Sequence, residues 1–257
     1  WPLPSMALLA HTLALLAMAV ATVAITVLPL NTALDSFDDQ YRGCGPAMTE
    51  LLPALNCSEF QQNPLFARVW AKAAAEWWRR GPPVTPLSPA QATAIMAFTM
   101  DGLDSVFNAA VRVAGCSHWE YRDTFHFKML HFLLTQALGT LRDALPGQCR
   151  DMFQQVCGVR IEAQFAQFMP TLLSKPMAQC LGEQTVFQVH TCHSADIAYC
   201  SEHLPEYEVW TPPFETFEVT EVTGEGDKAQ IQLCSSGTFS KYNCEWLQGD
   251  SRGDSLG

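Results

Sequence analysis

Two glutamates separated by one residue, Glu206 and Glu208, are the side chains of this sequence best placed for chemistry. They come directly before a segment that reads as a strand, and in extended backbone residues two apart project to the same side. Carboxylates held this close raise each other's pKa, so that one of them could act as a base. An acidic surface loop is the alternative, and composition alone favours it.

A second group of residues has the types that bind zinc. It comprises His190, Cys192, His193, Cys200 and His203. Imidazole nitrogens and thiolates at such density can form a tetrahedral zinc site. A disulfide-bearing strand with surface histidines accounts for the same residues and is the interpretation we favour, so we predict no metal.

Composition excludes several classes of protein. The chain has 257 residues, of which 48% are hydrophobic and 16% charged, and this indicates a globular protein with a full core. Its net charge of −11 argues against binding to nucleic acid or to anionic membrane surfaces. Ten cysteines are typical of an oxidising compartment.

The N-terminus predicts export. Residues 1–34 contain no charged side chain, and Leu8 to Val27 is almost wholly apolar, so we expect a signal peptide over residues 1–28. An N-terminal membrane anchor is the alternative. The C-terminus has no apolar tail of the kind that directs a GPI anchor, so we expect a secreted protein. We also expect it to be a monomer. The sequon at Asn56 predicts glycosylation in a surface loop.

The pattern of apolar residues divides the rest of the chain into helices followed by strands, which predicts an α+β fold. An irregular segment over residues 31–44 precedes the helices. Helices are expected at 64–80, 88–100, 103–114 and 125–145. Strands are expected at 152–159, 161–168, 185–192, 214–221, 230–234 and 242–247.

Six ordered blocks of sequence resemble the vertebrate ecto-enzyme family of arginine-specific mono-ADP-ribosyltransferases. The blocks are Asp35 to Tyr41 with Gly43-Cys44, Phe107 to Arg112, Phe125 to Thr135, His190-Thr191-Cys192, Glu206 to Phe217, and Tyr242-Asn243-Cys244. The resemblance implies helices packed on a split β-sandwich that holds NAD in a cleft. It implies a helical part over 29–147, a β-rich part with the cleft over 148–257, and one integrated catalytic domain over 29–250. It also implies two disulfides, Cys44–Cys244 and Cys149–Cys192.

The resemblance assigns chemistry to the two glutamates. The family transfers ADP-ribose from NAD to an arginine of an acceptor protein and releases nicotinamide. Glu208 would stabilise the positive charge that develops at the ribose C1′, as carboxylates do in glycosidases. Glu206 would hold the acceptor guanidinium, whose planar fork suits a carboxylate.

Two positions of the expected cleft depart from the family. Gln154 stands where the family has an arginine that binds the NAD phosphates, and Pro170 stands where it has a serine that orients the catalytic glutamate. Phe168 and Thr171, beside Pro170, are the other expected cofactor-binding residues. These changes leave two functions open, transfer of ADP-ribose and a secreted pseudoenzyme that only binds. Residues 161–165 are also shorter than in the family, through deletion or an error in the gene model.

Overall fold

The structure is a computed structural model that describes residues 34–81, 85–144, 149–157, 167–175, 184–198, 200–201, 208–226 and 228–249. The expected signal peptide and Glu206 lie outside these residues. Helices come first and strands follow, so the α+β prediction is confirmed. The helices are α2 (Gly45–Gln62), α3 (Pro64–Arg80), α4 (Pro89–Phe98), α5 (Leu103–Ala114), the π-helix η1 (Glu120–Thr124) and α6 (Lys128–Ala144). The strands are β1 (Arg150–Cys157), β2 (Met169–Leu172), β3 (Gln184–Thr191), β4 (Ala195–Asp196), β5 (Glu208–Thr211), β6 (Glu215–Glu225) and β7 (Lys228–Thr238), and the 3₁₀-helix η2 (Glu245–Gln248) comes last.

Local signals explain why the predicted helices form where they do. The Asn63 side chain accepts a hydrogen bond from the backbone of Phe66 at the start of α3, and Gly81, at φ 75°, ends it. Ser88 and Gln91 form a reciprocal capping box at the start of α4. The helices predicted over 64–80 and 103–114 agree with α3 and α5 to the residue.

Two predictions of local structure are wrong. The sequon at Asn56 lies inside α2 and not in a loop, because Leu55 and Glu59 are buried and fix this segment as a helix despite Pro53. Asn56 itself is half-buried. Residues 242–247 do not form a strand, since the chain turns into η2 after Cys244, whose φ is 59°.

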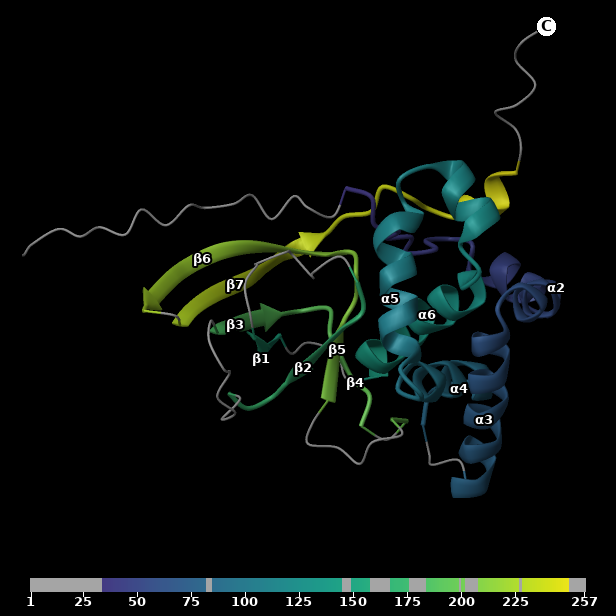
Figure 1. Cartoon of the computed structure of the whole chain (residues 1–257), viewed down its shortest axis with the longest axis horizontal. Coiled ribbons are helices and arrows are strands. Elements are labelled where there is room, and N and C mark those ends of the chain that lie inside the picture. The colour runs from purple at the N-terminus through teal and green to yellow at the C-terminus, as the bar shows by residue number, and fades with distance from the viewer. Residues whose placement is uncertain are drawn as a thin grey trace, which may run out of the picture. The chain divides into compact units, whose positions relative to one another are not determined.

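The helices share one apolar core with part of the sheet. Figure 1 shows the helices gathered beside the strands, with α5 and α6 nearest to them. Trp210 of β5 is fully buried and its ring lies 4.5 Å from that of Phe98 in α4. Phe168, just before β2, contacts Phe107 of α5 at 5.7 Å between ring centroids. The helical part therefore fixes the positions of β2 and β5.

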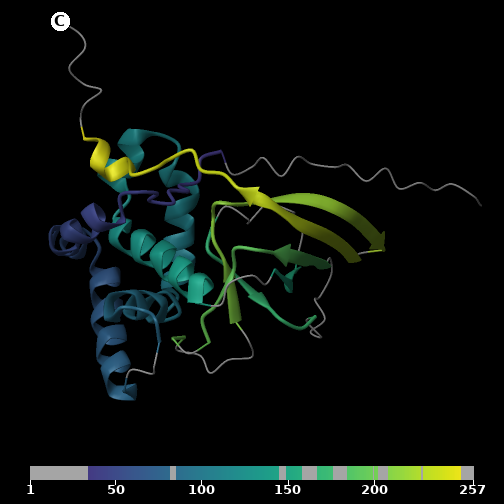
Figure 2. The ribbon, with the colours of Figure 1, turned by 180° about the vertical axis from the view of Figure 1, so that it is seen from behind.

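The seven strands follow the order β4-β5-β2-β1-β3-β7-β6. A single residue pair, Phe153 with Leu172, joins β1 to β2, whereas β1 and β3 pair along their whole length. The sheet is therefore split into a part made of β4, β5 and β2 and a part made of β1, β3, β7 and β6. Pairing is antiparallel throughout except between β3 and β7, which run parallel. Figure 2 shows the long β6–β7 hairpin from behind.

Both disulfides implied by the resemblance are present. Cys44–Cys244 joins the start of α2 to the C-terminal segment across 200 residues, and Cys149–Cys192 joins the start of β1 to the end of β3. Cys157 is disulfide-bonded as well. Beside the first bond, the buried carboxylate of Asp39 accepts hydrogen bonds from the backbone of Cys244 and Glu245. None of the described helices is both long and apolar enough to cross a membrane.

Candidate functional site

The described positions expected to bind NAD or act on it lie on three neighbouring strands. Gln154 is in β1, Pro170 is in β2 and Glu208 is the first residue of β5, and the sheet order places these strands side by side. Leu172 is paired with Phe153 on one side and with Glu208 on the other. Neighbouring strands lie about 4.8 Å apart, so the backbones of Phe153, Leu172 and Glu208 form a row across the three strands.

Pro170 is exposed and stands where β2 has a neighbour on one side only. It is paired with Trp210 of β5, and β1 has no residue paired with it. A proline in a strand lacks the backbone N–H that a second neighbour would require, and the single β1–β2 pair at Leu172 avoids this conflict. The position offers a ligand an apolar ring and no hydrogen-bond donor.

Gln154 is half-buried in the middle of β1 and is paired with Phe187 of β3. Its neutral amide can donate hydrogen bonds but brings no positive charge to this part of the sheet. Arg150, the nearest cation in β1, lies at the first position of the strand, and Gln154 is its fifth residue. An anion beside Gln154 therefore receives no charge from β1 at that point.

The remaining two predicted cofactor-binding residues have internal contacts. Phe168 is fully buried among the rings of Phe98, Phe107 and His131. Thr171 is 1% exposed, and its hydroxyl donates a hydrogen bond to the carbonyl of Val209 in β5 at 2.7 Å. Both side chains hold β2 in place, and their assignment as ligand contacts stays a prediction.

Two residues of α5 that position β2 were not predicted. Asn108 is buried, and its Nδ2 donates a hydrogen bond to the carbonyl of Phe168 at 3.1 Å. Arg112 donates from Nη1 to the Gln167 side chain at 2.5 Å. The signal in the sequence was an asparagine beside Phe107 on the apolar face of an amphipathic helix, because a buried amide requires a partner.

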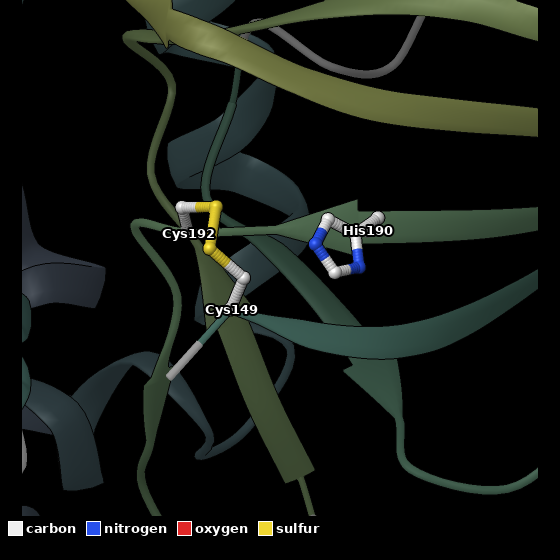
Figure 3. Close-up of side chains that lie close together, drawn as sticks. All are labelled: Cys149, His190 and Cys192. Atoms are coloured by element: carbon white, nitrogen blue, oxygen red, sulfur yellow. A yellow bond between two sulfur atoms is a disulfide. The ribbon is translucent and has the colours of Figure 1, made fainter. Parts of the chain in front are cut away.

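Of the residues considered as a zinc site, Cys192 is held in a disulfide, whereas Cys200 is a buried free thiol. Figure 3 shows Cys149, His190 and Cys192 side by side, and the two sulfur atoms are bonded to each other. A disulfide sulfur is not the thiolate that binds zinc. His190 Nδ1 pairs with Asp151 at 2.8 Å, and His193 Nδ1 lies 3.4 Å from Arg142. His203 lies outside the described residues.

Known proteins resemble this chain over most of its length. The sequence model of the family described as NAD:arginine ADP-ribosyltransferase matches residues 30–241. NAD(P)(+)--arginine ADP-ribosyltransferase 2 of Gallus gallus is 44% identical over 234 residues, which cover 87% of this chain and 74% of that protein. GPI-linked NAD(P)(+)--arginine ADP-ribosyltransferase 1 of Homo sapiens is 38% identical over 244 residues, covering 85% and 74%.

The fold matches solved structures of the same kind. The crystal structure of the eucaryotic mono-ADP-ribosyltransferase ART2.2 gives a TM-score of 0.66 at 26% identity and covers 83% of this chain and 97% of that one. A mutant of ART2.2 crystallised in complex with NADH gives a TM-score of 0.67 at 27% identity, covering 82% and 96%.

Proposed function

The chain belongs to the NAD:arginine ADP-ribosyltransferase family, and from this we propose that it transfers ADP-ribose from NAD to arginine residues of a protein acceptor, at a low rate. The observation that carries the proposal is the row Phe153–Leu172–Glu208, which places β5 and its glutamate beside the two strands expected to hold the dinucleotide. Relatives at 38–44% identity carry this activity in their names.

In the proposed reaction the bond between ribose C1′ and the nicotinamide nitrogen breaks, and nicotinamide leaves with the electron pair. Glu208 stabilises the positive charge that develops on the ribose. A guanidinium nitrogen of the acceptor then forms the new bond to C1′ and releases one proton. Glu206 holds that guanidinium and accepts the proton, since a carboxylate near a second carboxylate is the better base.

Gln154 and Pro170 make the proposed reaction slow. A charged hydrogen bond to phosphate is worth roughly 1.5–3 kcal/mol, and Gln154 cannot supply the charge. A positioned donor near the developing charge is worth roughly 2.7–4 kcal/mol, and the exposed ring of Pro170 has none. Together these losses predict a rate about 10³-fold to 10⁵-fold below that of a family member with both groups.

Restoring the two groups tests the proposal. We expect the double variant Gln154→Arg/Pro170→Ser to label an arginine-rich acceptor from labelled NAD far faster than the native chain. Glu208→Gln added to the double variant should abolish the gain. Gln155→Arg is the matched control, because it adds the same charge to the neighbouring residue, whose side chain faces the other way. A folded double variant that labels no faster than the native chain would refute the proposal.

A secreted pseudoenzyme that binds without transfer is the second candidate. The exposed proline in β2 favours it, since a proline opposite Trp210 offers a ligand neither a hydroxyl nor an N–H. This candidate predicts that the native chain transfers no label and that it binds NAD weakly or binds only a protein partner. Calorimetric binding of NAD without transfer would indicate an NAD-binding protein.

We also propose that the protein is extracellular and that residues 29–250 act as one domain. The disulfides Cys44–Cys244 and Cys149–Cys192 support the first, and the core shared between helices and strands supports the second. Recovery of the protein from culture medium, cleaved near residue 28, is the expected result. A mass shift on removal of N-linked glycan, lost in Asn56→Gln, would show whether a sequon within α2 is used.

A further inference from the structure

A pocket of about 450 Å³ lies where five separate segments meet. Its lining comes from the segment before α2, from α6, from the turn after β3, from the residue before β6 and from the last residue of β7. This volume falls in the range of small-molecule sites. None of its lining residues lies on β1, β2 or β5, so it is not the site described above.

Two arginines line the pocket in a chain with a net charge of −11. Arg42 donates to Gln40 Oε1 at 2.8 Å and to the Thr238 hydroxyl at 2.8 Å. Within the part of the chain that the structure describes, no carboxylate pairs with Arg42. Among these described groups, the positive charge of Arg42 is not balanced by an ion pair.

Arg142 brings a second guanidinium from α6, and it forms an ion pair with Asp143, which also lines the pocket. Its Nε and Nη2 atoms donate to Asp143 Oδ1 at 3.1 and 3.0 Å, and its Nη1 lies 3.4 Å from His193 Nδ1. Burial together with the charges of Arg142 and Arg42 lowers the pKa of His193, and Glu215 opposes this. A neutral His193 accepts from Arg142 at Nδ1 and keeps its proton on Nε2, where it is a donor.

The nearby carboxylate of Glu215 accepts its hydrogen bonds from other groups and not from the two arginines. It is 5% exposed and accepts hydrogen bonds from the hydroxyls of Thr191 and Ser235 and from the backbone of Cys192 and His193. Three of these donors share Oε1 and the Thr191 hydroxyl donates to Oε2, so both oxygens of Glu215 are engaged by groups of the sheet and the turn after β3.

The hydroxyl of Thr135 has no hydrogen-bond partner in the structure. Thr135 lies on α6, lines the pocket and is 5% exposed. A buried hydroxyl without a partner carries a desolvation cost, and a hydrogen bond with a ligand atom would remove this cost.

From these contacts we propose that the pocket binds a small organic ligand through a phosphate group held by Arg42, Arg142 and the Thr135 hydroxyl. Arg42 brings a charge that no described carboxylate pairs with, and Arg142, whose charge Asp143 partly offsets, adds a second guanidinium for the oxygens of a phosphate monoester. The pocket is larger than a phosphate ion, so it also accommodates a small organic part of the ligand, which would lie against Phe214.

Calorimetric titration of the native chain tests the proposal, with inorganic phosphate and ribose 5-phosphate as probes and ribose as the uncharged control. We expect both phosphates to bind, ribose 5-phosphate more tightly, and ribose to give no heat. Arg42→Gln and Arg142→Gln should each weaken binding about tenfold to a hundredfold, the loss expected for one charged hydrogen bond. Thr135→Val should weaken it less. Arg79→Gln, which removes an exposed arginine of α3, is the matched control and should change nothing.

Two outcomes would overturn the proposal. One is the absence of heat from either phosphate up to about 10 mM. The other is equal binding by native, Arg42→Gln and Arg142→Gln proteins that show the native circular dichroism. Titration with NAD separates this site from the proposed transfer site, because Arg42→Gln should leave any binding of NAD unchanged.

Discussion

The carboxylate of Glu59 caps the N-terminus of α6 and is buried in the core. Glu59 lies on α2 and is 3% exposed. Its Oε1 accepts from the backbone N–H of Lys128 at 2.6 Å, and its Oε2 accepts from that of Met129 at 3.0 Å. Burial raises the pKa of Glu59 from the ordinary 4.5 to about 7, although both hydrogen bonds and the charge of Lys128 oppose the rise.

This shift fixes the sign of a pH effect on stability. Between pH 4.5 and pH 7 the folded chain binds a proton at Glu59 that the unfolded chain has lost. The contribution of Glu59 to the unfolding free energy is therefore fully present below pH 4.5, and it decreases as the pH rises toward 7. A rise from 4.5 to about 7 corresponds to about 3 kcal/mol of unfolding free energy.

The substitution Glu59→Gln removes the titration and keeps the shape of the side chain. We expect the unfolding free energy of the variant minus that of the native chain to increase by about 3 kcal/mol between pH 4.5 and pH 7. Urea unfolding followed by circular dichroism at intervals over this range measures the difference. The range ends below the point where Lys128 titrates, since burial lowers its pKa to about 8.

Glu50→Gln, an exposed change on the same helix, is the control and should follow the native profile. Comparing variants removes the contributions of Asp38 and Asp39, whose pKa values burial also raises. If Glu59→Gln and the native chain show parallel pH profiles, then Glu59 does not bind its proton as the structure implies and the reasoning is refuted.

Three further changes test other contacts. Asn108→Ala should lower the unfolding free energy by about 1–2 kcal/mol and speed proteolysis near β2, because it removes the bond that holds the start of that strand. Replacing Cys44 and Cys244 together by serine should cost about 5 kcal/mol, measured by urea unfolding, since the bond closes 200 residues. Glu215→Gln should cost more than 2 kcal/mol in the same assay, with the exposed Glu218→Gln as an unaffected control.

Local features of the sequence were enough to predict much of the secondary structure. The helix at 64–80 has a cap at Asn63 and a stop at Gly81, and the structure begins and ends α3 at the same residues. The segment of α2 lacked such signals, because Pro53 interrupts it and its apolar residues do not form one face. Packing of Leu55 and Glu59 against other helices makes it helical, and no local pattern contains that information.

The sequence by itself determined the family, through ordered motifs. It also determined that Gln154 brings no charge and Pro170 no hydroxyl, because residue identity alone decides what a side chain can donate. Only the tertiary structure decided which groups meet. It joined the two parts of the sheet through one residue pair, turned Phe168 and Thr171 inward, and brought Arg42 and Arg142 to one pocket. Contacts between residues a hundred positions apart depend on how helices and strands pack, and spacing along the chain does not specify that packing.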